Sequence, residues 1–227
     1  MGFALREARP GDIYEMAQVM VAAYEDHPIW TRMMHSVPVP SQVEFTAATL
    51  RQRFRSGVVR YFKIEEAQES DNLDKVVAWA GLKLPSRRQA QETRITLPDG
   101  VDGQSAEDFF KTLSPPLAKY GYDPEKHCEF RGLVVRPDRQ RLGLGRWLVA
   151  HRSNIVNSYG YTTYMIARNT SLNLFRQHGA VVLDTVQLEM TRYGEANLSD
   201  GRVYVMRQDV AGVNPSQNSM TDQEQEG

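Results

Sequence analysis

The chain has 227 residues, 41% of them hydrophobic and 24% charged, a composition typical of a soluble globular protein. Its 27 Lys and Arg residues nearly balance 28 Asp and Glu residues, so the charge pattern predicts no nucleic-acid partner. A single cysteine, Cys128, excludes an internal disulfide framework, and no apolar run approaches the roughly 20 residues of a membrane span. We therefore expect a cytoplasmic protein without a membrane partner.

The first half of the chain predicts strands and helices in alternation. Phe3–Arg9 alternates apolar and polar residues as a strand does, and Asp12 follows at a position suited to cap a helix. Pro28 is expected to break that helix. The next predicted elements are a helix from about Ser41 to Gly57 and two strands at 58–66 and 75–84, joined as a hairpin.

The region from about 85 to 127 is an insertion that is polar, contains Pro and Gly, and has one short predicted helix near 106–113. Insertions of this length inside a compact domain are commonly functional segments, disordered segments or lids. The predicted elements after it are a strand at 128–135, a helix from 144 to 159, a strand at 161–167, a helix at 171–178, and strands at 180–190 and 202–210.

This order of elements predicts a mixed α/β (α+β) fold with helices on both faces of a mostly antiparallel sheet. The strand at 128–135, the helix after it and the strand at 161–167 form a β-α-β unit, whose two strands should be parallel neighbours. We expect a single domain over 1–209. The remaining residues, 210–227, are polar and without periodicity, which predicts a disordered tail.

The segment RPDRQRLGLGRW, residues 136–147, carries the clearest functional signal. A strand, a glycine-containing turn and a helix start lie together here. The first turn of a helix has N–H groups without intrahelical acceptors, and glycine lets a ligand approach the backbone. The pattern therefore predicts a pyrophosphate site over Leu142–Arg146, with charge added by Arg139, Arg141 and Arg146. A tight turn with a solvated basic surface is the alternative.

Two familiar phosphate loops do not fit this segment. The P-loop requires Gly-Lys followed by Ser or Thr, and the dinucleotide fingerprint requires a third glycine where Leu148 stands. The segment LVVRPDRQRLGLG, with Gln140, Gly143 and Gly145 in the spacing Gln-x-x-Gly-x-Gly, instead resembles the acyl-CoA-binding motif of the GNAT superfamily of N-acetyltransferases. The order of elements, the opening LREARPGDIYEMAQVMVAAY and the segment NTSLNLFRQHGA resemble that family as well.

The resemblance implies the GNAT fold and an enzyme that uses acetyl-CoA as its co-substrate. It also implies that two central strands splay apart, so that the pantetheine arm pairs with backbone on one of them. The residues that the resemblance assigns to coenzyme binding are Leu133, Val134, Val135, Gln140, Arg141, Leu142, Gly143, Leu144, Gly145, Arg146, Asn169 and Phe175. The five histidines are scattered without the spacing of metal ligands, so we expect no metal.

Glu129 stands where the histone-acetylating branch of the family has its general base. The attacking amine must lose a proton, because an ammonium group has no lone pair. Regular alternation along the strand would place Glu129 on one face with Arg131, Leu133 and Val135. The alternative is a structural ion pair between Glu129 and Arg131 at the edge of the sheet.

Phe175 departs from the family pattern, because many members have a tyrosine there that protonates the leaving thiolate. Tyr161 or Tyr164 would replace that tyrosine, or the step proceeds unassisted. Glu25 and Asp26 follow the first helix, in a region that lines the acceptor pocket in this family. Two carboxylates there would favour a cationic amine; the alternative is a solvated helix end.

These observations predict an N-acetyltransferase that acts by direct attack of a primary amine, on a small amine or amino-acid-like molecule. Two alternatives stay open from the sequence. One is a protein acetyltransferase that modifies lysine or an N-terminus, which the position of Glu129 supports. The other is a non-catalytic acyl-CoA-binding domain, which the absence of a hydroxyl at Phe175 supports.

Overall fold

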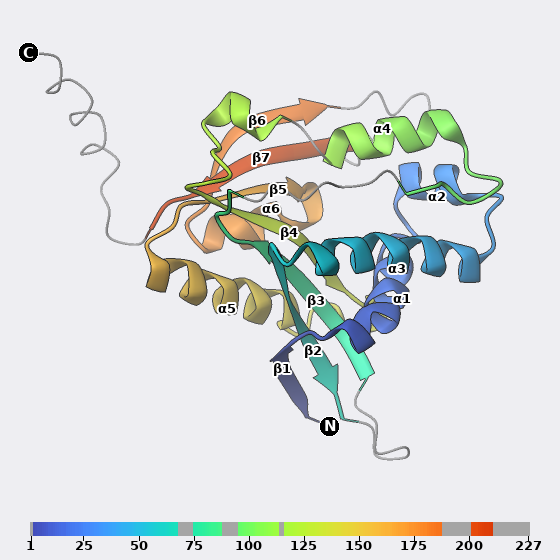
Figure 1. Cartoon of the computed structure of the whole chain (residues 1–227), viewed down its shortest axis with the longest axis horizontal. Helices are drawn as coiled ribbons and strands as arrows, with labels where there is room; N and C mark the ends of the chain where they lie inside the picture. The colour runs from blue at the N-terminus through green and yellow to red at the C-terminus, as the bar shows by residue number, and fades with distance from the viewer. Residues whose placement is uncertain (1, 68–74, 88–94, 114–115, 188–200, 211–227) are drawn as a thin grey trace, which may run out of the picture.

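A computed structural model describes residues 2–67, 75–87, 95–113, 116–187 and 201–210 of the chain (Figure 1). Seven strands in these residues form one sheet in the order β1-β2-β3-β4-β5-β7-β6. Neighbouring strands are antiparallel except for β4 and β5, which are parallel. The structure therefore confirms the mixed α/β fold and the parallel pair in the middle of the sheet.

The first half of the chain forms the first three strands and three helices. β1 (Phe3–Glu7), β2 (Val59–Glu66) and β3 (Lys75–Lys83) pair in sequence order, which confirms the predicted hairpin of β2 and β3. The turn of that hairpin lies outside the described residues. Between β1 and β2 the chain forms α1 (Ile13–Ala23), α2 (Pro28–Met34) and α3 (Val39–Ser56).

The second half begins with the insertion, which contains α4 (Gly103–Leu113) and a 3-10 turn at Leu117–Tyr120. The elements that follow are β4 (Cys128–Val135), α5 (Leu144–Tyr159), β5 (Thr163–Arg168), α6 (Asn169–Gln177), β6 (Val181–Gln187) and β7 (Arg202–Gln208). The predicted tail lies outside the described residues, apart from position 210.

The sheet packs helices on both faces, and adjacent residues of β3 show how it separates the two cores. Trp79 faces the core that contains buried residues of α1, α2, α3 and α4. Its neighbours Ala78 and Ala80 face the core formed with α5 and α6. Successive side chains of a strand point to opposite faces, so a single strand supplies both cores. Figure 1 shows α5 and α6 away from α2 and α4.

Two local predictions for the N-terminal region were wrong. Pro28 does not break α1, which already ends at Ala23; it begins α2, where His27 Nδ1 accepts the Trp30 N–H at 3.3 Å. Proline is tolerated at this first helical position because its N–H would lack a partner anyway. Asp12 does not cap α1, because it lies in a helical conformation at the end of a 3-10 turn. Its carboxylate accepts hydrogen bonds from Arg9 N–H and Lys63 instead.

Among the described helices, none combines the length and the apolar character needed to cross a membrane.

Candidate active site

A β-bulge at Gly132 changes the direction of side chains along β4. Ala80 lies opposite Leu133 and Gly81 opposite Arg131, so Gly132 is the extra residue, with φ of 79°. A Cβ atom at Gly132 would lie 2.9 Å from the Trp79 ring. Glycine meets both requirements, since it has no Cβ and adopts positive φ without strain.

The bulge corrects the expectation that Glu129 shares a face with Leu133 and Val135. Leu133 and Val135 pack against the α5–α6 core, where Cys128 and Phe130 also lie. Glu129 and Arg131 alternate with Cys128 and Phe130, so their side chains point to the opposite face. The extra residue Gly132 shifts the alternation by one position, so residues after it change face relative to residues before it.

β4 and β5 separate after a short parallel ladder. The paired residues are Cys128 with Thr163, Glu129 with Tyr164, and Phe130 with Met165. Beyond Phe130, β4 continues to Val135 without further pairing to β5 in the described ladder. The side of β4 that faces β5 therefore presents backbone groups to whatever lies between the strands.

A cavity of about 790 Å³ opens at this separation. Leu133 and Val134 of β4, Ile166 of β5 and Phe175 of α6 line its inner part. The opposite walls come from α1, α2, α3 and the insertion, and they include Tyr24, Trp30, Phe45, Phe109, Phe110 and Tyr122. Its volume lies within the range of ordinary small-molecule sites. The insertion thus forms part of the wall of the cavity.

Glu129 lies in a cluster of charges on the cavity wall, and its side chain is 12% exposed. Its Oε1 is 2.8 Å from Arg131 Nε, and its Oε2 is 3.9 Å from Lys83 Nζ. The Tyr122 hydroxyl donates to Oε2 at 3.4 Å. Burial, and secondarily the negative charge of Glu129, raise the pKa of Tyr122, so that phenol stays protonated. The ion pair of Glu129 with Arg131 that the sequence left open is present, but it lies on a central strand and not at the edge of the sheet.

The glycine turn has the backbone that the sequence predicted. Gly143 has φ of 83° and precedes α5, and the Trp147 N–H donates to the Gly143 carbonyl at 3.0 Å. The N–H groups before Trp147 belong to the first helical turn, which has no acceptors within the helix. A Cβ atom at Gly143 would meet nothing within 4 Å, whereas one at Gly145 would lie 3.5 Å from Leu174. Open space therefore lies at Gly143.

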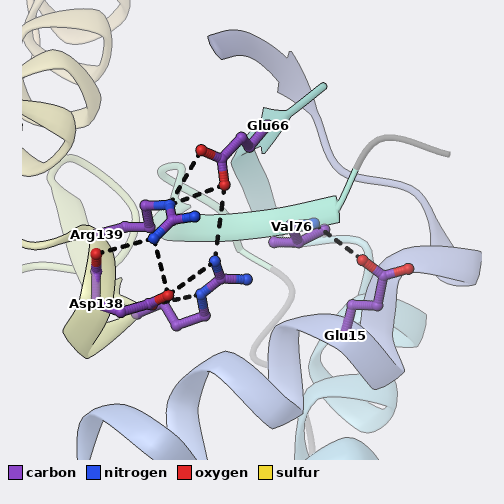
Figure 2. A network of polar contacts seen from close by, with 6 residues as sticks. Glu15, Glu66, Val76, Asp138 and Arg139 are labelled. Atoms are coloured by element: carbon purple, nitrogen blue, oxygen red, sulfur yellow. Dashed lines mark hydrogen bonds and ion pairs between the residues drawn. The ribbon is translucent and has the colours of Figure 1, made fainter. Parts of the chain in front are cut away.

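The arginines of this segment do not act alike. Arg139 donates to both carboxylate oxygens of Glu66, at 2.8 and 3.0 Å, and it contacts Asp138 (Figure 2). Arg136 shares the same two carboxylates. Their positive charge is thus largely neutralised within the protein. Arg141 and Arg146 are exposed, and the contact from Arg146 to Gln177 is 3.4 Å long.

The structure also shows where three other residues assigned to coenzyme binding lie: Gln140, Asn169 and Phe175. The Gln140 side chain donates to the Val135 carbonyl at 3.2 Å, so it fixes the turn. Asn169 is exposed at the first position of α6, next to the cavity residues Arg168 and Thr170. Phe175 is buried and packs edge to face on Phe130, with ring centroids 5.4 Å apart.

Glu25 and Asp26 are exposed at the end of α1 and are not among the residues lining the cavity. Tyr161 and Tyr164 do not line it either. The sequence analysis missed Lys83, Tyr122 and Arg168, which do. The sequence analysis also missed the bulge, for which the one available signal was Gly132 inside the strand pattern.

Comparison with known proteins agrees with the family that the glycine motif resembles. The model of the family described as the Acetyltransferase (GNAT) family matches residues 44–180. No curated protein matches the sequence.

Solved structures share the fold at low sequence identity. The structure of histone acetyltransferase HPA2 and related acetyltransferase from Corynebacterium glutamicum is 15% identical in sequence, and the alignment covers 94% of this chain and 99% of that one with a TM-score of 0.54. PaiA N-acetyltransferase from Thermoplasma acidophilum in complex with coenzyme A is 11% identical, with coverages of 92% and 99% and a TM-score of 0.51. The ribosomal-protein-S18-alanine N-acetyltransferase from Escherichia coli is 14% identical, with coverages of 94% and 97% and a TM-score of 0.50.

The family match spans more than half of the chain and includes β4, the glycine turn, α5 and the cavity residues of β5 and α6. The chain therefore belongs to the GNAT family of acetyltransferases.

Proposed function

We propose that the protein is an acetyl-CoA-dependent N-acetyltransferase that acetylates a primary amine of a small molecule by direct attack. The observation that carries this proposal is the arrangement along β4. The strand leaves β5 after Phe130, and a cavity lined by Glu129 opens there. The glycine turn follows the end of the same strand. One strand thus links a candidate pyrophosphate site to a candidate base.

The glycine turn fits the pyrophosphate of the coenzyme. Open space surrounds Gly143, and the first-turn N–H groups of Leu144–Arg146 precede the first bonded N–H of α5. These groups donate to phosphate oxygens, and the helix dipole favours negative charge at this end. Arg141 and Arg146 are the exposed cations of the turn, whereas Arg139 stays on Glu66.

The separated edge of β4 fits the pantetheine arm. The backbone of Leu133–Val135 pairs with an extended ligand as with a short additional strand. When bound, acetyl-CoA supplies an activated thioester carbonyl. A backbone N–H of Leu133 or Val134 then donates to the carbonyl oxygen and stabilises the negative charge that develops there.

Glu129 accepts the proton that the attacking amine loses, directly or through water. The leaving thiolate has no hydroxyl at Phe175 to protonate it. A thiol has a pKa of only about 8.5, so the thiolate leaves without a tyrosine at this position. The cavity volume of about 790 Å³ is that of an ordinary small-molecule site, which supports a small acceptor.

The first test is thermal unfolding with acetyl-CoA, coenzyme A, ATP and NADH, each added separately. Coenzyme at about 100 times its dissociation constant stabilises the folded state by roughly 2.7 kcal/mol, a rise of about 5–10 °C in Tm for a domain of this size. We expect a shift with acetyl-CoA and coenzyme A but none with NADH. Thiol release with free amines, compared with peptides, then measures the activity. No shift with either coenzyme would overturn the proposal.

A matched pair of variants tests the turn itself. Asn and Asp both tolerate positive φ and have the same shape, so Gly143→Asn and Gly143→Asp carry the same backbone cost. Aspartate adds a carboxylate in the open space over the turn. We expect coenzyme affinity at least tenfold weaker for Gly143→Asp than for Gly143→Asn, because the carboxylate repels pyrophosphate. Equal affinities would remove the turn from the coenzyme site.

A further inference from the structure

The charges on the cavity wall indicate which acceptor it fits. Four cationic side chains line the cavity: Arg53, Lys83, Arg131 and Arg168. Glu129 is the carboxylate among the described lining residues. An acceptor with a second cationic group, such as a polyamine or a lysine side chain, would meet net repulsion here. This reverses the expectation, based on Glu25 and Asp26, that the pocket favours a cationic molecule.

Among these four cations, Lys83 has N–H groups that are available to bind a ligand. Its side chain is 15% exposed at the end of β3, and its Nζ lies 3.9 Å from Glu129 Oε2, beyond hydrogen-bond distance. It also lies over the Tyr122 ring, 5.9 Å from the centroid. In the described part of the chain no hydrogen-bond acceptor is found for its three N–H groups. A half-buried lysine side chain on the cavity wall whose ammonium has no such acceptor favours an anion bound in the cavity.

Glu129 is the one negative charge between the two cations Arg131 and Lys83 in the described lining. Arg131 contacts both oxygens of the carboxylate, and Lys83 lies 3.9 Å from Oε2. A molecule with an amine next to a carboxylate matches this pattern, because its amine lies beside Glu129 while its carboxylate accepts from Lys83. Charge-assisted hydrogen bonds of this type are stronger than neutral ones.

The rest of the wall fits an apolar body. Tyr24, Trp30 and Phe109 meet with ring centroids 5.5 to 5.9 Å apart. Phe45 and Phe110 extend this aromatic wall. The lining also contains polar side chains, among them Thr46, whose Oγ1 is buried and has no hydrogen-bond partner in the described residues.

We propose that the acceptor is a small amino carboxylate with an apolar, aromatic-sized side chain, held by Lys83 through its carboxylate and presented to Glu129 through its amine. This rests on the proposed function, because it names the acceptor of the same site. Lys83 is then the residue that distinguishes an amino acid from the corresponding amine.

The test uses three pairs of acceptors that differ only in the carboxylate: phenylalanine and phenethylamine, tryptophan and tryptamine, leucine and 3-methylbutylamine. Binding is measured by calorimetry on the full-length protein with and without coenzyme A, and thiol release from acetyl-CoA gives kcat/KM. We expect at least one amino acid to exceed its amine by tenfold or more. Lys83→Met keeps the length of the side chain and should abolish that preference.

Lys75→Met is the matched control, because Lys75 is exposed at the other end of β3. It should leave the preference unchanged, and the Tm of each variant shows that it folds. Equal or better use of the amines, or a preference that survives in Lys83→Met, overturns the inference. So does a normal acetyl-CoA shift with no binding of any acceptor, an outcome that leaves the coenzyme assignment intact. Loss of the acetyl-CoA shift with retained amino-acid binding overturns the proposed function instead.

Discussion

At the scale of single residues, Glu129 has two roles that the structure brings together. Its carboxylate forms an ion pair with Arg131 at 2.8 Å, and it also faces the cavity. A structural ion pair and a general base predict different consequences of mutation. Removing Arg131 breaks the pair but leaves the carboxylate, whereas removing the charge of Glu129 abolishes both.

We expect Glu129→Gln to lower kcat by roughly 10²–10⁴-fold with little change in coenzyme affinity, because the amide cannot accept the amine proton. Arg131→Met should lower kcat far less, since the base remains. Steady-state kinetics and the acetyl-CoA shift in Tm measure both quantities. Equal losses of kcat in the two variants would reduce Glu129 to a partner of Arg131.

At the scale of elements, the bulge in β4 directs Glu129 and Arg131 into the cavity. Gly132 combines φ of 79° with a Trp79 ring that leaves no room for a Cβ atom. Gly57 at the end of α3 has a similar φ of 68° but nothing within 4 Å of its Cβ position. The two glycines therefore separate the cost of backbone conformation from the cost of the steric contact.

We expect Gly57→Ala to lower the free energy of unfolding by about 1 kcal/mol, the cost of left-handed backbone. Gly132→Ala should lower it by at least about 1 kcal/mol more, because the methyl group also displaces Trp79. Urea unfolding of both variants gives the difference. Equal destabilisation would show that β4 absorbs the extra methyl group.

The start of α2 makes a second element-scale prediction, on pH. His27 Nδ1 accepts the Trp30 N–H, which requires an unprotonated nitrogen. Burial, and then the charge of Arg168, lower the pKa of His27 to about 4. The unfolded chain therefore binds this proton more readily. The contribution of His27 is complete above pH 6.5 and is lost as pH falls towards 4, up to about 3 kcal/mol.

His27→Asn keeps a good N-cap without a titrating group. We expect the free energy of unfolding to fall less between pH 7.5 and pH 5 in this variant than in the wild type, as measured by urea titration. Burial also lowers the pKa of His127, His151 and His178, so a part of the dependence should remain. An unchanged pH dependence would contradict the role of His27.

At the scale of the whole molecule, one buried charge opposes stability. Arg152 of α5 is 1% exposed, and its three guanidinium nitrogens have no hydrogen-bond partner in the described residues. Its guanidinium carbon lies 4.9 Å from the centroid of the Phe130 ring. Burial lowers the pKa of this arginine to about 10. The face of the Phe130 ring compensates only in part for the hydration that the Arg152 guanidinium loses on burial.

Arg152→Met should therefore raise the free energy of unfolding by about 1–3 kcal/mol, because methionine fills the space without a charge. The control is Arg51→Met on the exposed side of α3, which should change it by less than about 0.5 kcal/mol. Urea unfolding measures both. A loss of stability in Arg152→Met would mean that the cation contributes more than its desolvation costs.

The sequence predicted the elements well because their signals are local. Hydrophobic periodicity located β4 and α5, and Gly57, Gly160 and Gly179 ended helices as expected. Pro28 was predicted to break a helix but begins α2, because proline disrupts the interior of a helix and yet suits its first position. The bulge was missed because it depends on how many residues β4 has relative to the strand it pairs with, β3. The alternating pattern of β4 alone does not contain that information.

The glycine turn, the strand before it and the helix after it were determined by the sequence alone, because φ, capping and periodicity depend on residues close in the chain. The tertiary structure decided which face of the sheet each side chain occupies and which distant residue it contacts. Arg139 turns to Glu66, 73 positions away, and Lys83 meets Glu129 across two paired strands. Such contacts arise only when the sheet forms, because strand register sets which distant side chains meet.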